Sequence, residues 1–313
     1  MTRIGILGIG GVGGFLGAKL AIKYAASDDV EIVFIARGEN QKAIQQKGLR
    51  LITAKGEETA HPDVVTNDPA EIGELDFLIC CVKSYHLEDA LAPLKPCVNG
   101  NTIILPLLNG VDARERIEGI FPENEVWDGC VYIMARLIEP GVVSELGNIH
   151  QYHFGSTSGS RRKLETLERI FTDAGVDTFL SKDIEQTIWD KFLLISTIAT
   201  LTSALDFSIQ EIFADRNHQN SLLKLMEELV AVGEAKGVRF SDGVVEKTLK
   251  ILKSTPAGGT SSMHSDFVRG GSTEYKSLTE YVVNQGKRLG VPTPNYESSL
   301  SVLASKTKAA SSV

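Results

Sequence analysis

Residues 3–22 read RIGILGIGGVGGFLGAKLAI and decide the fold. Their first part, residues 3–9, is a short apolar run of the kind that forms a buried strand. Glycines then recur in a turn, and residues 15–25 carry small and apolar side chains at helical spacing. A second apolar run, VEIVFIA, follows at residues 30–36. This order predicts a strand, a tight turn, a helix and a second strand, which is the βαβ unit of a parallel sheet.

The turn between the first strand and the helix matches the pattern GxGxxG. In this context the first glycine permits the tight turn, the second lets a pyrophosphate approach the backbone, and the third lets helix and strand pack closely. The helix N-terminus then stabilises the anion. The alternative is that the glycines serve only the geometry of the turn. The residues predicted to bind a dinucleotide here are Gly8, Ile9, Gly10, Gly11, Val12 and Gly13.

The first half of the chain continues the alternation of strands and helices. Apolar runs at residues 76–82, 101–108 and 125–133 alternate with helix-like stretches at 87–94 and 112–121. Such alternation predicts a doubly wound α/β fold, with a mostly parallel sheet and helices on both of its faces.

Two regions depart from this alternation. Residues 48–65 read as paired extended segments around a turn and form an insertion. After residue 182 the strand-like pattern ends, and long amphipathic stretches predict an all-α domain. We therefore expect a Rossmann-like NADP-binding domain of residues 1–182 and a helical substrate and catalytic domain of residues 183–313. The expected helices of the second domain span residues 184–205, 216–236, 242–253, 274–289 and 295–305.

The residue at the end of the second strand selects between the two nicotinamide cofactors. A free ribose 2′-hydroxyl usually meets a carboxylate at this place, whereas a 2′-phosphate needs a cation. The sequence supplies Arg37, whose planar guanidinium can hold a phosphate with two hydrogen bonds. This favours NADPH over NADH. The alternative is a solvated arginine that pairs with Glu39.

Lys83 and Asn109 follow the third and fourth strands. The carboxyl ends of parallel strands meet at the edge of the sheet where such folds bind ligands. We expect Lys83 to add a second cation beside the adenosine phosphate, and Asn109 to contact nicotinamide or substrate. Asn109-Gly110 is also an ordinary turn signal, which is the alternative reading of this pair.

Lys191 lies within the strongly apolar stretch at residues 184–205. Desolvation by apolar neighbours lowers the pKa of an ammonium group toward neutrality, where it is a competent proton donor. The alternative is a lysine whose stem covers apolar surface while its head reaches water. Farther along, Ser262 precedes the expected helix at residues 274–289, and Glu274 stands at the start of that helix. Hydroxyl and backbone donors before a helix suit a carboxylate. Read alone, these two residues are ordinary caps.

Composition bounds the function of the 313-residue chain. Its 32 basic and 40 acidic residues give a formal charge of −8, and no run of basic residues is present to bind nucleic acid. No run of 18 apolar residues predicts a membrane span, and the glycine-rich N-terminus reads as part of the fold rather than a signal peptide. The histidines and cysteines lack metal-ligand spacing, so we expect no metal. The cysteines, which we expect to be reduced thiols in the cytoplasm, are Cys80, Cys81, Cys97 and Cys130.

Together these motifs resemble the ketopantoate reductase (2-dehydropantoate 2-reductase) family along nearly the whole chain. The resemblance implies an NADPH-dependent reduction of the C2 ketone of ketopantoate to pantoate, for coenzyme A synthesis. It implies that Lys191 is the general acid, that Glu274 is its partner and contacts substrate and cofactor, that Ser262 binds the substrate carboxylate, and that Asn109 positions nicotinamide and substrate. The motifs that carry it are the glycine turn, Arg37, Val82-Lys83-Ser84, Leu108-Asn109-Gly110, Trp189-x-Lys191, Ser261-Ser262-Met263-x-x-Asp266 and Thr273-Glu274.

The chain departs from the family pattern at two positions. The family has asparagines four and eight residues after the catalytic lysine, where this chain has Ile195 and Ala199. Losing two polar arms shifts preference between related 2-oxo acids, and Thr197, Thr200 or Ser203 would compensate only if the helix were rotated. A dehydrogenase for another 2-oxo acid or an imine, and a non-catalytic NADPH sensor, therefore stay open as alternatives. The sequence also leaves open a monomer or a homodimer.

Overall fold

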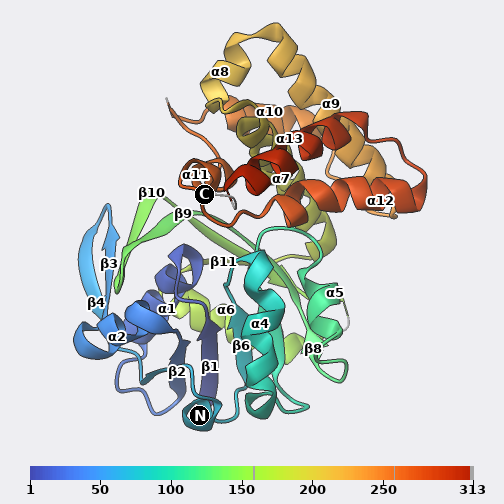
Figure 1. Cartoon of the computed structure of the whole chain (residues 1–313). Helices are drawn as coiled ribbons and strands as arrows, with labels where there is room; N and C mark the ends of the chain where they lie inside the picture. Colours follow the sequence, from blue (N-terminus) through green and yellow to red (C-terminus); the bar gives the residue numbers. More distant parts are fainter. Residues whose placement is uncertain (158, 257, 311–313) are drawn as a thin grey trace. The chain divides into compact units, whose positions relative to one another are not determined.

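The computed structural model describes residues 1–157, 159–256 and 258–310 (Figure 1). The chain divides into two compact units. The first comprises Met1–Leu108 and Asp112–Ile184, and the second comprises Asn109–Val111 and Glu185–Val313. The short segment Asn109–Val111 thus leaves the first unit and packs with the helical one.

A six-stranded sheet organises the first unit, and its β1, β2 and β6 are neighbouring arrows in Figure 1. Its order is β5-β2-β1-β6-β7-β8, and every pairing is parallel. This confirms the predicted doubly wound sheet. The strands are β1 (Thr2–Leu7), β2 (Val30–Ile35), β5 (Val64–Thr66), β6 (Phe77–Cys80), β7 (Ile103–Pro106) and β8 (Glu125–Val126).

Both faces of this sheet are covered by apolar cores, and successive side chains of a strand point to opposite faces. Ile79 belongs to one apolar core and Cys80 to the other, while Cys81 packs against the same core as Ile79. The adjacent cysteines Cys80 and Cys81 therefore contact opposite cores. The helices of this unit are α1 (Gly11–Lys23), α2 (Gly38–Lys47), α3 (Pro69–Ile72), α4 (Leu87–Leu91), α5 (Ala113–Glu118) and α6 (Arg161–Asp173), with 3₁₀ turns at Ser84–His86 and Ala92–Cys97.

A second sheet, which was not predicted as a whole, has the order β11-β10-β3-β4 with β9 paired to β10. Its β3 and β4 are antiparallel, which confirms the paired extended segments expected at residues 48–65. A long antiparallel ribbon of β9 and β10, together with β11, which is parallel to β10, forms the rest. The strands are β3 (Leu49–Thr53), β4 (Gly56–Ala60), β9 (Asp128–Glu139), β10 (Val142–Gly155) and β11 (Asp177–Leu180).

The expectation of one strand at residues 125–133 is wrong. Glu125–Val126 pairs with β7 in the parallel sheet, and the chain then passes into β9 of the second sheet. Trp127 lies between the two segments, fully buried, and stacks on Phe154 of β10. An apolar run shows that a segment is buried, but it does not specify in which sheet the segment pairs.

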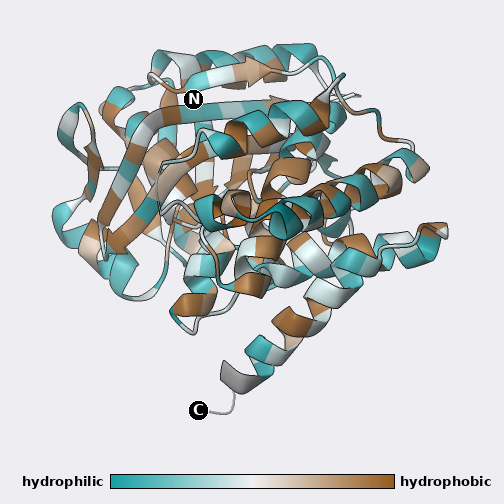
Figure 2. Ribbon diagram, turned by 90° about the horizontal axis from the view of Figure 1, so that it is seen from above, coloured by the Kyte–Doolittle hydropathy of each residue, from teal (hydrophilic) through white to brown (hydrophobic). Residues whose placement is uncertain are grey.

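The second unit is all-α, as predicted. Its central helix α7 (Ile184–Leu205) has the expected bounds, while the short helices α8 and α11 were not predicted. Apolar and polar residues alternate along the helical ribbons (Figure 2), and the apolar ones form the core of this unit. The others are α8 (Ile209–Ala214), α9 (Arg216–Ala235), α10 (Val244–Lys253), α11 (Ser262–Val268), α12 (Tyr281–Leu289) and α13 (Pro294–Ala310), with a π-helical turn at Lys276–Glu280.

By length and composition alone α7 is apolar enough to cross a membrane. However, 72% of its most apolar window is buried within the protein. Trp189, Phe192 and Leu193 of α7 belong to the apolar core of the helical unit. These contacts are those of a core helix.

Candidate active site

The glycine turn links β1 to α1 and has the geometry of a pyrophosphate site. Gly8 has φ +92°, and a Cβ there would meet the side chain of Val82. Both the backbone conformation and the lack of space therefore require glycine. A Cβ on Gly13 would collide with the carbonyl oxygen of Gly8, which explains how tightly α1 packs on β1. A Cβ on Gly10, by contrast, would meet no protein atom within 4 Å. The turn is therefore open on the side where a ligand would approach.

Helix α1 begins at this open side. Gly10 is its N-cap residue and has no side chain to cap the first turn. The first N–H groups of α1 and the dipole of this helix are thus available to an anion. Ile9 is buried and Val12 packs against the same core, while a Cβ on Gly11 would collide with the backbone of Ala135 in β9. One side of the turn is packed against the protein and the side at Gly10 is open, which fits a dinucleotide pyrophosphate.

Arg37 is the N-cap residue of α2 and is exposed. Among the residues that the structure describes, its guanidinium makes no hydrogen bond or ion pair. The alternative pairing with Glu39 is not observed, because Glu39 binds Lys42 at 2.8 Å. Lys83 is half-buried at the carboxyl end of β6 and precedes the 3₁₀ turn at Ser84–His86. Both cations stand where the sequence places them, just beyond strand ends.

Three of the expected site residues come together in the helical unit. The Nζ atom of Lys191 donates a hydrogen bond to Oδ1 of Asn109 at 3.1 Å. The Nδ2 atom of Asn109 donates in turn to Oε2 of Glu274 at 3.4 Å. Lys191 and Glu274 are 6% and 3% exposed, so the lysine is not a solvated surface residue. The amide of Asn109 joins a buried ammonium to a buried carboxylate.

Ser262 is the first residue of α11 and is exposed. The neighbouring Ser261 caps that helix by accepting a hydrogen bond from the backbone N–H of His264 at 3.0 Å. The hydroxyl of Ser261 also bonds to Thr202 of α7 at 2.9 Å, which ties the start of α11 to the central helix. The capping role thus falls on Ser261, and the hydroxyl of Ser262 is not used for it.

The two departures from the family pattern occupy apolar surroundings. Ala199 is 3% exposed within the core of the helical unit, and Ile195 packs against that core. The hydroxyl of Thr197 bonds to the carbonyl of Leu193, and that of Thr200 bonds to Thr279. Thr197 and Thr200 are therefore satisfied inside the protein.

The chain matches one family over both of its halves. Residues 4–159 match the model of ketopantoate reductase PanE/ApbA, and residues 183–307 match the model of the ketopantoate reductase PanE/ApbA C terminal. The chain belongs to the ketopantoate reductase family. It is therefore an oxidoreductase of that family, and its cofactor is a nicotinamide dinucleotide.

Relatives support the same assignment over the full length. The chain is 30% identical to 2-dehydropantoate 2-reductase of Mesorhizobium japonicum, covering 96% of both chains. It is 26% identical to the uncharacterized oxidoreductase YkpB of Bacillus subtilis, covering 93% of this chain and 94% of that one. The crystal structure of 2-dehydropantoate 2-reductase from Porphyromonas gingivalis is 34% identical, with a TM-score of 0.83 over 95% of this chain and 97% of that one.

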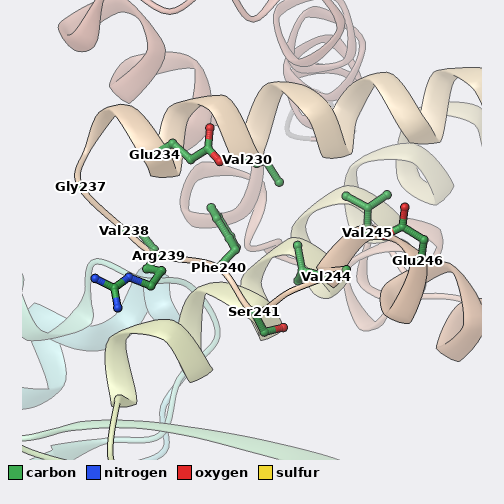
Figure 3. Close-up of a pocket in the computed structure, with 11 residues that line it drawn as sticks. Val230, Glu234, Gly237, Val238, Arg239, Phe240, Ser241, Val244, Val245 and Glu246 are labelled. Carbon is green, nitrogen blue, oxygen red and sulfur yellow. The ribbon is translucent and has the colours of Figure 1, made fainter.

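A separate cavity of about 530 Å³ lies beside the end of α9 in this ketopantoate reductase family member. Figure 3 shows Phe240 pointing from the loop toward α9, while Arg239 points away from it. Phe240 also packs edge-on against Trp189 of α7. None of the expected catalytic residues lines this cavity. It is not the place where the family motifs gather.

One residue that contacts the glycine turn was not predicted from the sequence. Asn40 of α2 hydrogen-bonds both to Ile9 in the glycine turn and to Gly141 between β9 and β10. Nothing in the local sequence signals this, because its two partners are 31 and 101 residues away. Only the folded chain brings the three segments together.

Proposed function

We propose that the protein is a cytoplasmic 2-dehydropantoate 2-reductase, which reduces ketopantoate to pantoate with NADPH in pantothenate and coenzyme A biosynthesis. The observation that carries the proposal is the buried ammonium of Lys191, hydrogen-bonded to Asn109. A solvated structural lysine would have no need of a buried acceptor. A buried, oriented amine suits a proton donor.

The first unit binds the cofactor in this proposal. The N–H groups at the start of α1 hold the pyrophosphate, and the open face of Gly10 admits it. Arg37 and Lys83 hold the 2′-phosphate of the adenosine ribose, which selects NADPH. When bound, NADPH supplies the hydride for the carbonyl carbon of the substrate.

The second unit supplies the proton and the substrate contacts. Lys191 donates a proton from Nζ to the ketone oxygen as negative charge develops there. The Oδ1 atom of Asn109 fixes the direction of the amine, and Glu274 fixes the amide of Asn109. Glu274 and Asn109 also contact substrate and cofactor, and the hydroxyl of Ser262 donates to the substrate carboxylate.

A second candidate is a reductase of the same architecture for a different 2-oxo acid. Ile195 and Ala199 favour it, because two apolar side chains replace amides on the helix that carries the catalytic lysine. A missing hydrogen bond in a closed site costs about 1–3 kcal/mol, which is enough to change the preferred substrate.

Steady-state kinetics across a panel of 2-oxo acids test the proposal. With NADPH in excess, ketopantoate should give the highest kcat/KM. A higher value for another 2-oxo acid would establish the second candidate. Saturable NADPH binding without turnover of any member of the panel would indicate a non-catalytic sensor instead.

A further inference from the structure

The side chain of Asn40 holds three distant segments of the first unit together. Its Nδ2 donates to the carbonyl oxygen of Ile9 at 2.9 Å, and its Oδ1 accepts from the N–H of Gly141 at 2.8 Å. One amide therefore joins the glycine turn, the start of α2 and the turn between β9 and β10. An amide suits this place because it supplies a donor and an acceptor at once.

The turn that contains Gly141 is itself fixed against α2. Gly141 has φ +77°, and a Cβ there would come within 3.1 Å of Ala43. Its carbonyl oxygen accepts a hydrogen bond from the backbone of Arg50 at 2.8 Å. The anchor to which Asn40 is bonded is thus a close-packed turn. It gives the amide a firm second point of attachment.

The glycine turn touches the same ribbon at a second point. Gly11 is packed so closely against Ala135 of β9 that a Cβ could not be accommodated. The ribbon of β9 and β10 therefore backs the turn through Gly11, and it also binds Asn40 through Gly141. These two contacts leave the glycine turn little freedom to move relative to the start of α2.

Arg37 begins the same helical turn that carries Asn40. It is the N-cap residue of α2, three residues before Asn40, and its guanidinium reaches solvent without a protein partner in the described part of the chain. Because Asn40 is bonded to Ile9, the root of the Arg37 side chain is held at a fixed distance from the glycine turn. In the proposed function these two places hold the pyrophosphate and the adenosine 2′-phosphate of one cofactor, so their spacing affects how well both phosphates are bound.

We propose that Asn40 is a positioning residue for cofactor selection, because it sets the spacing between the pyrophosphate turn and the Arg37 phosphate site. This inference rests on the proposed function, in which the glycine turn and Arg37 bind NADPH. Both polar atoms of the Asn40 side chain are bonded to the protein, so we assign it no direct contact with the cofactor or the substrate. It acts through Ile9 and Arg37.

A double-mutant cycle tests the role. The dissociation constants of NADPH and NADH are measured by fluorescence titration for the wild type, Asn40→Ala, Arg37→Gln and the double variant. Asn40→Ala should weaken NADPH binding roughly tenfold more than NADH binding, which is the scale of one lost interaction with a charged group. In the Arg37→Gln background, Asn40→Ala should weaken the binding of both cofactors equally.

Gln45→Ala is the matched control. Gln45 is on the same helix and donates to the carbonyl of Val65 at 2.7 Å, but it has no bond to the glycine turn. We define the selectivity ratio as the dissociation constant of NADH divided by that of NADPH. Gln45→Ala should leave this ratio unchanged. If Asn40→Ala does not fold, as judged by circular dichroism, Asn40→Ser is measured instead. That neutral variant is too short to bridge Ile9 and Gly141 and adds no charge, so the ratio still reports the spacing.

The outcomes separate the inference from the function beneath it. If Asn40→Ala keeps the wild-type selectivity ratio while Arg37→Gln lowers it, the role of Asn40 is overturned and the NADPH assignment stays in place. An unchanged ratio in Arg37→Gln would remove Arg37 from the cofactor site, and with it the spacing role. We predict that each single variant lowers the selectivity ratio. We also predict that the double variant has the same ratio as Arg37→Gln alone.

Discussion

The Nζ atom of Lys191 lies 3.1 Å from Oδ1 of Asn109, although the two residues are 82 positions apart in the sequence. Asn109 follows β7 of the first unit, yet it packs with the second unit together with the next two residues. The strand end thus delivers an amide to the helix that carries the lysine. The direction of the ammonium depends on this amide.

Replacing Asn109 with alanine should lower kcat by about 10–100-fold, because a misdirected proton donor loses much of its effect. The fold should persist, since the residue lies in a short connecting segment. Steady-state kinetics and thermal unfolding measure the two effects. Asn217→Ala, an exposed change in α9, is the control. A normal kcat in Asn109→Ala would show that Lys191 needs no such partner.

The glycine turn predicts opposite consequences at two of its positions. Gly10→Ala adds a methyl group that meets no protein atom, so it should fold normally but bind dinucleotide at least about tenfold more weakly. Gly13→Ala places a methyl group against Gly8 and Cys81 and should cost about 1–3 kcal/mol of unfolding free energy. Denaturant unfolding and cofactor titration separate the two. Wild-type NADPH affinity in Gly10→Ala would argue against a pyrophosphate at this face.

Arg37→Gln should raise the KM for NADPH by about 10–100-fold and leave that for NADH nearly unchanged, since only NADPH carries the 2′-phosphate. Arg37 makes no side-chain capping bond to α2, so the helix start should survive the change. Lys47→Gln, at the other end of α2, removes a charge without touching the proposed site. If Arg37→Gln and Lys47→Gln changed the KM values for NADPH and NADH in the same way, the effect would come from net charge only.

Stability should depend on pH through Asp206. The hydrogen bond from Lys306 holds the pKa of Asp206 below its ordinary value of 3.8. A carboxyl whose folded pKa is lowered stabilises the fold above its ordinary pKa, and this contribution is lost as pH falls through the folded value. Asp206→Asn should therefore lower the melting temperature at neutral pH, and the difference from wild type should vanish in acid.

The expected effect of Asp206→Asn is small, within about 1 kcal/mol, because the Asp206 side chain is 62% exposed. Asparagine is chosen because Asp206 has φ +58° and asparagine tolerates this left-handed conformation. The substitution therefore removes the charge without straining the backbone. Thermal unfolding between neutral pH and about pH 3 measures the difference. A difference that grows as pH falls would contradict the assigned sign.

The sequence predicted those elements whose pattern is local. The first strand, the glycine turn and the following helix were predicted because the glycine spacing between an apolar run and a helical stretch is typical of this turn. Helix α7 was predicted with its bounds, since a long apolar stretch has few other solutions. The segment at residues 125–133 was assigned to one strand because sheet membership depends on pairing partners elsewhere in the chain.

The candidate site shows the same limit. Arg37 and Lys83 could be placed at strand ends from the order of the apolar runs alone. The hydrogen bond between Lys191 and Asn109 could not be derived from spacing, because it depends on where residues 109–111 pack. Asn40 was missed altogether, since its partners Ile9 and Gly141 come from separate segments.

The central claim is that Lys191 donates the proton to the ketone oxygen in an NADPH-dependent reduction of ketopantoate. It is tested most directly by the loss of reduced-nicotinamide absorbance when ketopantoate is added to wild type, Lys191→Ala and the control Lys250→Ala, an exposed change in α10. Lys191→Ala should lower kcat by about 10²–10⁴-fold while its dissociation constant for NADPH stays at the wild-type value, and Lys250→Ala should behave as wild type. Turnover by Lys191→Ala at the wild-type rate, or an equal loss of turnover and NADPH affinity, would contradict the account.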